Sequence, residues 1–276
     1  MSDSPVQAAT TPIAFARLQR TPGRGVALVH LIALAAAAAA VAMTADLARW
    51  HLGELAVIAA LTIGSELTSR ESGSAMLRVS GSFLGLVLAA VLLGGAPAAC
   101  LGALTIVAGW TRSREAGHYF AQNLLIYAWF PWLSGMLFHV LVSACGLDSG
   151  DLGYYLLVFA VFILAMLLNF VGVAAYVSWV DGSTLAQKAR EALAPVLASQ
   201  LFSALLTIIA VYVEVRLGPS GLGLFGLVLV FSQYLVGELL VSQRRSRELG
   251  GIATDAAASS PSRPPELVQR QPPGLV

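Results

Sequence analysis

Long apolar stretches separated by short polar segments dominate the hydrophobic pattern of the chain. Five of these stretches contain no Lys, Arg, Asp or Glu. Each reaches the length of about 20 residues that a membrane-spanning helix needs. They cover residues 26–45, 120–144, 152–180, 192–213 and 217–237. The pattern therefore predicts at least five spanning helices.

Three shorter apolar stretches lie between the first and second of these, at 51–67, 79–93 and 96–110. The last two are separated by Gly94-Gly95-Ala96-Pro97. Glycine and proline do not readily continue a helix, so we expect a tight helical hairpin there. Together the stretches predict an all-α, polytopic helical membrane protein with about eight transmembrane helices, and with six or seven if the short arms are re-entrant.

The composition supports this class and excludes several others. Hydrophobic residues make up 57% of the 276 residues, charged residues 11%, and the mean hydropathy is +0.78. A soluble globular protein carries about a quarter charged residues, and a disordered chain is more polar still. A net charge of +1 excludes a strongly basic nucleic-acid-binding protein.

The positions of the basic residues predict the orientation, because cytoplasmic loops are enriched in Lys and Arg. With eight spans, fourteen of the 16 Lys and Arg residues fall on the side of the two termini. Only Arg49 and Arg216 fall on the other side. We therefore expect both termini in the cytoplasm and a multi-pass protein of the bacterial inner (cytoplasmic) membrane.

The polar ends of the chain frame a single membrane domain. Residues 1–25 are expected to form a cytoplasmic tail, 26–249 the helical membrane domain, and 250–276 a disordered cytoplasmic tail rich in Ser, Pro and Ala. After residue 180, Ser183 is expected to cap a short amphipathic helix over 185–193.

Ionisable groups at membrane depth are candidate functional residues, because each is costly to bury. Glu54 and Glu66 bracket a segment too short to keep both in water, so they are candidate ligand-binding residues, together with Gln122 and Asn123 at the start of the 120–144 stretch. Glu214 is instead expected to pair with nearby Arg216 at the interface.

The densest polar connection precedes residue 120. It contains Arg112, Arg114 and His118, and a second basic group, Arg244 and Arg245, follows the last span. These residues are either a positive-inside anchor with aromatic belt residues, or a surface for a partner or for lipid head groups.

Signatures of catalysis and metal binding are missing from the sequence. It has no phosphate loop, no nucleophile elbow and no His-Glu-x-x-His motif. The 4 histidines are scattered, so we expect no enzyme, no metal site and no cofactor. His30 and Asn169 are expected to form hydrogen bonds between helices. Cys100 and Cys145 are expected to be free thiols, with a disulfide as the alternative.

The order of motifs resembles a known kind of membrane module. Gly64-Ser65-Glu66-Leu67, residues 79–83, the hairpin at 93–99, the segment 119–128 and the final stretch 221–249 follow in the order found in integral membrane (MASE-type) sensor regions of bacterial HD-GYP and GGDEF signalling proteins. The chain shows neither an HD pair nor a GGDEF-like loop.

The resemblance implies a sensor-like module without its own catalytic output, which either acts through a cytoplasmic signalling protein or no longer signals. Its partners are the lipid bilayer, such a signalling protein and further copies of the chain in a homo-oligomer, and no nucleic acid is expected. Two alternatives remain open. The hairpin tips at 94–97 and 217–221 also resemble those of small-molecule transporters or substrate-binding membrane subunits, which often contain repeats. A membrane scaffold without a ligand would explain the few polar sites equally well.

Overall fold

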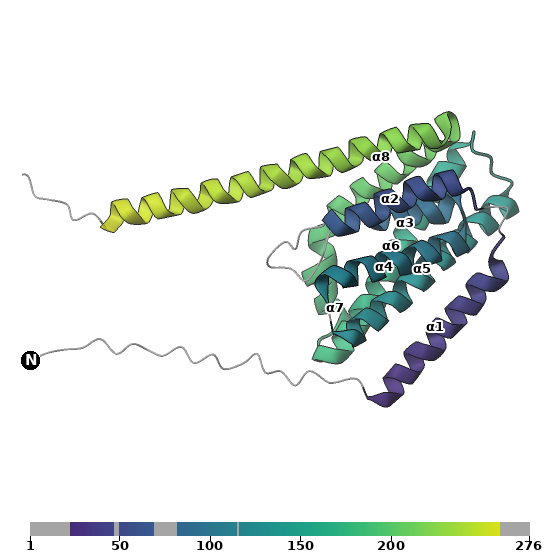
Figure 1. The fold of residues 1–276 in the computed structure, drawn as a ribbon, viewed down its shortest axis with the longest axis horizontal. Helices are drawn as coiled ribbons and strands as arrows, with labels where there is room; N and C mark the ends of the chain where they lie inside the picture. Colours follow the sequence, from purple (N-terminus) through teal and green to yellow (C-terminus); the bar gives the residue numbers. More distant parts are fainter. Residues whose placement is uncertain (1–22, 47–49, 69–81, 115, 260–276) are drawn as a thin grey trace, which may run out of the picture. The chain divides into compact units, whose positions relative to one another are not determined.

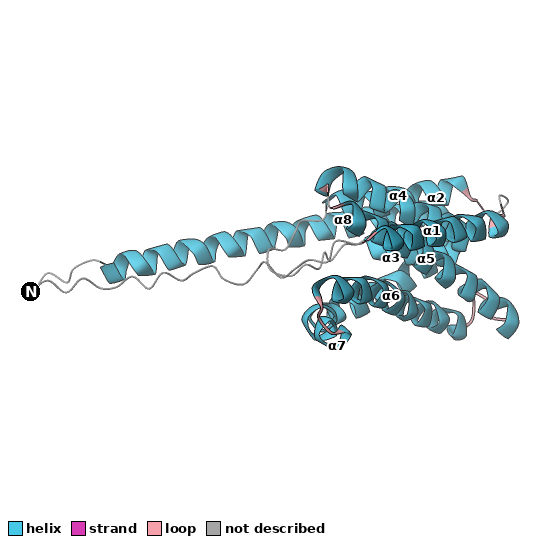
Figure 2. Cartoon of the chain, turned by 90° about the horizontal axis from the view of Figure 1, so that it is seen from below, coloured by secondary structure: helices cyan, strands magenta, loops and turns pink. Residues whose placement is uncertain are grey.

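The computed structural model describes residues 23–46, 50–68, 82–114 and 116–259, and all its regular elements are helices (Figure 2). The helices are α1 (Arg24–Thr44), α2 (Leu52–Thr68), α3 (Ser82–Leu92), α4 (Gly95–Ser113), α5 (Gly117–Cys145), α6 (Leu152–Asp181), α7 (Leu185–Lys188), the π-helical turn η2 (Ala189–Leu193) and α8 (Ala194–Ser259). Each apolar stretch of the sequence forms a helix, so the all-α class is confirmed.

Four helical segments of the described residues are long and apolar enough to cross a membrane. They are Gly25–Thr44, Gly117–Cys145, Leu152–Asp181 and Val196–Ser232. On α1, Leu28, Val29, Leu31 and Ile32 are 57–65% exposed, which suits a surface in contact with lipid rather than water. The protein is therefore built as a membrane-embedded helical protein.

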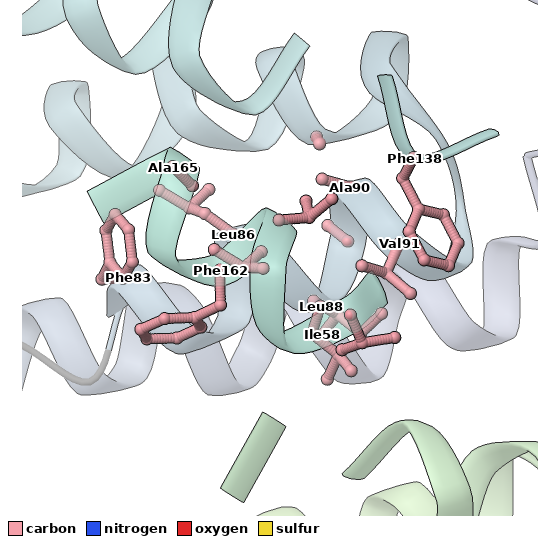
Figure 3. Close-up of a cluster of buried hydrophobic side chains, with 14 of the residues drawn as sticks. Ile58, Phe83, Leu86, Leu88, Ala90, Val91, Phe138, Phe162 and Ala165 are labelled. Atoms are coloured by element: carbon pink, nitrogen blue, oxygen red, sulfur yellow. The ribbon is translucent and has the colours of Figure 1, made fainter. Parts of the chain in front are cut away.

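The short helix α3 lies at the centre of the bundle. All its residues from Ser82 to Val91 are buried, and it packs against α2, α4, α5 and α6. Phe83 stacks on Phe130 at 5.3 Å and meets Phe162 edge-on at 5.2 Å between ring centroids. Figure 3 shows this apolar core, which side chains of α2, α5 and α6 complete. A helix that is apolar on all sides is suited to such an enclosed position.

Glycines allow α4 to pack closely against α5. A Cβ atom at Gly102 would overlap the backbone carbonyl of Tyr127, and one at Gly135 would lie 2.5 Å from the backbone nitrogen of Gly95. The hairpin before α4 turns at Gly94, whose φ of 94° is accessible mainly to glycine. The predicted hairpin at 94–97 is confirmed, and α4 and α5 lie side by side (Figure 1).

Helix α8 is interrupted at Gly218, which has φ 68° and ψ −167° and is followed by Pro219. The predicted turn at 217–221 is thus confirmed, although the helix before it continues past residue 213. After the turn, Leu61 of α2 packs against Gly226, leaving no room for a Cβ there. From Val228 on, the described chain belongs to a second unit, in which α8 continues through Ser259.

Two local expectations are corrected. Thr184, not Ser183, caps α7, because its hydroxyl accepts a hydrogen bond of 3.2 Å from the backbone N–H of Gln187. Ser183 instead donates to the carboxylate of Asp181, which also pairs with Lys188 at 2.9 Å. Residues 250–259, expected to be disordered, are helical, whereas the expected tails at 1–22 and 260–276 lie outside the described residues.

Candidate functional site

Three separate groups of polar side chains lie within the apolar bundle. Glu66 lies near the end of α2, Gln122 near the start of α5, and Glu54 in the first turn of α2. Glu54 and Glu66 are twelve positions apart on one helix, or about 18 Å at 1.5 Å per residue. The two acids therefore belong to different sites.

The carboxylate of Glu66 is buried where three helices meet. Its Oε2 accepts a hydrogen bond of 2.9 Å from the hydroxyl of Ser82, at the start of α3. Gly109 of α4 leaves room for the carboxylate, since a Cβ there would lie 3.1 Å from Oε1. Beside it, the guanidinium of Arg112 donates to the backbone carbonyl of Leu67. These contacts join the end of α2 to the start of α3 and to α4, so they give Glu66 a structural role.

Gln122 links three helices through a chain of hydrogen bonds. Its Oε1 lies 2.6 Å from Nε2 of His30 on α1, and its amide nitrogen donates to the carbonyl of Gly172 on α6 at 3.2 Å. Nδ1 of His30 lies 2.8 Å from the carbonyl of Val26. Both ring nitrogens of His30 thus lie within hydrogen-bond distance of an oxygen atom, one on its own helix and one on α5.

Aromatic rings surround this chain of hydrogen bonds. Tyr176, buried on α6, meets the ring of His30 edge-on at 5.7 Å and lies 6.4 Å from the ring of His118. His118 packs on Tyr119 at 4.3 Å. A pocket of about 520 Å³ between α1 and α5 is lined by both histidines and by apolar residues such as Leu34. It combines an apolar wall with two imidazoles.

Glu54 is half-buried, and its carboxylate interacts electrostatically with that of Glu214 on α8. Glu214 is only 8% exposed. The expected ion pair between Glu214 and Arg216 is wrong, because the guanidinium of Arg216 lies over the ring of Tyr212, 5.6 Å from its centroid. The buried carboxylate of Glu214 thus lacks the cation that the sequence suggested.

A second pocket, of about 620 Å³, lies beside the hairpin between α3 and α4. Its polar lining residues are Thr44, Asp46, His139 and Ser143. Thr44 is held in place because its hydroxyl accepts a hydrogen bond of 2.9 Å from the indole of Trp132. The pocket joins a carboxylate, an imidazole and hydroxyls next to the first turn of α4.

Asn123 and Arg114 take no part in the contacts described above. Asn123 is half-buried next to Gln122, and Arg114 ends α4 with an exposed side chain and a φ of 48°. Arg244 and Arg245 lie on α8 in the second unit, where only the backbone is described. Among the described side chains, Glu54, Glu66 and Gln122 therefore belong to separate groups.

Other expectations for single polar groups have mixed outcomes. His30 does bond to a neighbouring helix as expected, whereas the buried Oδ1 of Asn169 has no hydrogen-bond partner in the described part of the chain. Cys100 and Cys145 are both free thiols. Across the described ranges, no three His, Cys, Asp or Glu side chains are grouped as a metal site would need.

The sequence predicted the surroundings of Glu214 wrongly, because it placed this buried residue at the membrane interface. A signal for its burial is present in the spacing of the helix before the turn. Ala204, Thr207, Val211 and Glu214 recur every three or four residues, and all four are buried. Such spacing places residues on one face of a helix, so Glu214 continues a buried stripe rather than starting the polar interface.

Comparisons of the chain with protein-family models, curated proteins and solved structures find no match.

Proposed function

We propose that the protein is an integral membrane sensor-like module of the bacterial inner membrane, which acts on a cytoplasmic partner through α8. The observation that carries the proposal is that α8 joins a buried acid to a basic segment. Its first arm bears the buried Glu214, the turn at Gly218 follows, and the helix then continues through Arg244 and Arg245 to Ser259. One element thus belongs both to the buried core and to the basic segment.

The helix directions support an eight-span topology with cytoplasmic termini. Contacts make α2 antiparallel to α3, α4 antiparallel to α5, and α5 antiparallel to α6, while α1 and α5 run in the same direction. Regular alternation of eight spans requires these relations. Two contacts define each relation. They are Glu66–Ser82 and Thr62–Gly85 for α2 and α3, Gly95–Gly135 and Gly102–Tyr127 for α4 and α5, Gln122–Gly172 and Phe138–Tyr154 for α5 and α6, and His30–Gln122 and Thr44–Trp132 for α1 and α5.

Within the second unit, α8 runs from Val228 to Ser259, a length of about 48 Å at 1.5 Å per residue, which is more than the hydrocarbon thickness of a bilayer. A helix of this length extends beyond the membrane. Under the proposed topology it emerges on the cytoplasmic side, where Arg244 and Arg245 are available to an acidic partner surface.

A small-molecule transporter is the second candidate. The pocket of about 620 Å³ favours it, because this volume is within the range of pockets that hold small molecules, and its lining combines Asp46 with His139. Under the proposed topology the pocket lies on the side away from the cytoplasm.

Photo-crosslinking in intact cells of the native host separates these functions. A photoreactive residue replaces Val241 or Glu248 on α8, and Gly150 in the connection between α5 and α6 serves as the control position. A sensor-like module gives one discrete protein adduct from the α8 positions only, and Arg244→Glu with Arg245→Glu abolishes it at unchanged membrane abundance. No adduct, together with solute uptake by vesicles of the purified protein, would establish transport instead. If the protein gives neither a crosslinked adduct nor solute uptake, the result supports a membrane scaffold.

A further inference from the structure

The pocket between α1 and α5 has no part in the proposed function. Its volume is about 520 Å³, and its lining comes from residues 26–34 of α1 and 117–121 of α5. These residues form the beginnings of the two helices, which run in the same direction. Both helices are long and apolar enough to cross a membrane. The pocket therefore lies near a membrane surface, whichever side of the membrane that is.

The apolar wall of this pocket is continuous with the surface that α1 presents to lipid. Leu31 lines the pocket and is 65% exposed, and Leu28, one turn earlier, is 57% exposed. Val26 and Leu34 are the other large apolar side chains of the wall. A hydrocarbon chain of the surrounding bilayer can therefore enter the pocket without exposing apolar surface to water.

Two imidazoles with different surroundings form the polar part of the pocket. His30 is 8% exposed, and its two ring nitrogens already lie within hydrogen-bond distance of oxygens of Val26 and Gln122, so its ring is a fixed part of the wall. The ring of His118 is half-buried, packs on Tyr119 and forms no hydrogen bond to another described residue. Because an imidazole carries at least one N–H, His118 can donate to an oxygen of a ligand in the pocket.

The sequence that leads into both helices is basic. Residues 12–25 precede or begin α1, residues 110–118 connect α4 to α5, and together they contain five arginines and one acid, Glu115. Arg114 has an exposed side chain and precedes the pocket residue Gly117 by three positions, which is at most about 11 Å of chain. Its guanidinium can therefore reach an anion at the pocket, and its fork of N–H groups suits phosphate oxygens.

We propose that this pocket binds an anionic phospholipid, with the phosphate at Arg114 and His118 and an acyl chain between α1 and α5. A soluble phosphate compound shares the head-group chemistry, but it leaves the apolar wall at Leu31 and Leu34 uncovered. A zwitterionic phospholipid covers this wall, but its own ammonium group cancels the charge that the basic sequence attracts. The site goes beyond the proposed function, because it requires neither a partner nor a particular side of the membrane.

Native mass spectrometry of the purified full chain in detergent tests the proposal. Dioleoylphosphatidylglycerol and dioleoylphosphatidylcholine, which share their acyl chains and differ in head group, are titrated separately. We expect one phosphatidylglycerol to bind about fivefold or more tightly than phosphatidylcholine. Equal affinities for the two lipids would overturn the proposal. Displacement of phosphatidylglycerol by inorganic phosphate, but not by chloride at the same ionic strength, would also overturn it and assign the pocket to a soluble phosphate compound.

Arg114→Asn and His118→Ala test the contacts with the head group. Asparagine tolerates the φ of 48° at position 114 and removes the charge. We expect each change to weaken binding of phosphatidylglycerol about fivefold or more and to leave that of phosphatidylcholine unchanged. Arg216→Ala is the matched control, since Arg216 lies over Tyr212 and does not line the pocket. His118→Gln keeps an N–H donor and restores part of the affinity. Unchanged lipid preference in both Arg114→Asn and His118→Ala would refute the head-group site.

Ala27→Trp tests the place of the acyl chain by filling the pocket from α1. Ala27 lines the pocket and is exposed, so the indole displaces no side chain of the core. We expect the variant to lose phosphatidylglycerol binding while the thermal midpoint of the lipid-free protein stays the same. Ala39→Trp, at another exposed position of α1 outside the pocket, is the matched control and retains binding. Full binding by Ala27→Trp would place the lipid elsewhere and contradict the proposal.

Discussion

The hydroxyl of Ser82, the first residue of α3, donates a hydrogen bond of 2.9 Å to Oε2 of Glu66, near the end of α2. Both residues are buried, with exposures of 0% and 9%. The bond joins the end of one helix to the beginning of the next across sixteen positions of sequence. It aligns the carboxylate with the positive end of the α3 dipole.

Replacement of Ser82 by alanine removes this donor and leaves the carboxylate buried. We expect the free energy of unfolding to fall by about 1–3 kcal/mol, measured by denaturant titration in detergent. Ser203→Ala is the control, since the hydroxyl of Ser203 donates to the carbonyl of Ser199 on its own helix. Glu66→Gln keeps an acceptor and should cost less than Ser82→Ala. Equal losses of unfolding free energy for all three variants would show that the hydrogen bond between Ser82 and Glu66 adds no more stability than a hydrogen bond within one helix.

Gly102→Ala places a methyl group against the backbone of α5. Its Cβ would overlap the carbonyl of Tyr127 and touch the ring of Pro131 at 3.4 Å, and neither group has a flexible side chain that can move away. We expect a loss of about 1–3 kcal/mol of stability, seen as a lower thermal midpoint in detergent.

The control for this change is Gly64→Ala on α2, where a Cβ would meet nothing within 4 Å. Alanine favours helix there by up to about 1 kcal/mol, so this variant should match or exceed the stability of the unchanged protein. A midpoint for Gly102→Ala equal to that of Gly64→Ala would contradict the close packing of α4 on α5.

A double-mutant cycle measures the contact between α1 and α5. His30→Leu and Gln122→Leu each break the hydrogen bond of 2.6 Å between the two side chains. We expect the single changes to cost about 0.5–2 kcal/mol each and the double change to cost less than their sum, because an interhelical bond is lost only once. Additive costs in unfolding measurements would indicate that the two side chains do not interact.

Cysteine labelling tests the topology in a background that lacks Cys100 and Cys145. A membrane-impermeant maleimide added to spheroplasts should label Gly150→Cys, in the exposed connection between α5 and α6. Ala186→Cys, exposed on α7, should react only after permeabilisation. The reverse pattern would invert the orientation, and equal labelling of both would contradict a membrane crossing of α6 between the two positions.

Most of the helix pattern could be predicted from sequence, because apolar length and glycine–proline turns are local signals. The turns at Gly94 and Gly218 have positive φ values, and both were marked by neighbouring glycine and proline. The cap of α7 was misassigned by one residue since Ser183 and Thr184 are both good caps, and only the bond to Gln187 distinguishes them. The extension of α8 past residue 249 was missed because Ala-rich polar sequence suits both helix and coil.

The sites were harder to predict, since they depend on which helices become neighbours. The sequence marked Gln122 and His30 separately, but only packing of α1 on α5 brings them together. Glu214 and Arg216 are two residues apart, which made an ion pair plausible in an extended or interfacial chain. In a helix the same spacing sends the two side chains to different faces, so the arginine reaches Tyr212 and the acid continues the buried face of the helix.

The enclosed position of α3 has a consequence for biogenesis. Its 11 residues amount to about 16 Å of helix, roughly half the hydrocarbon thickness, and every one of them from Ser82 to Val91 is covered by other helices. Such a segment has no surface left for lipid in the finished protein. Because the described part of α3 is shorter than the bilayer is thick, we expect it to be held against α2 and α4 during insertion until α5 and α6 enclose it.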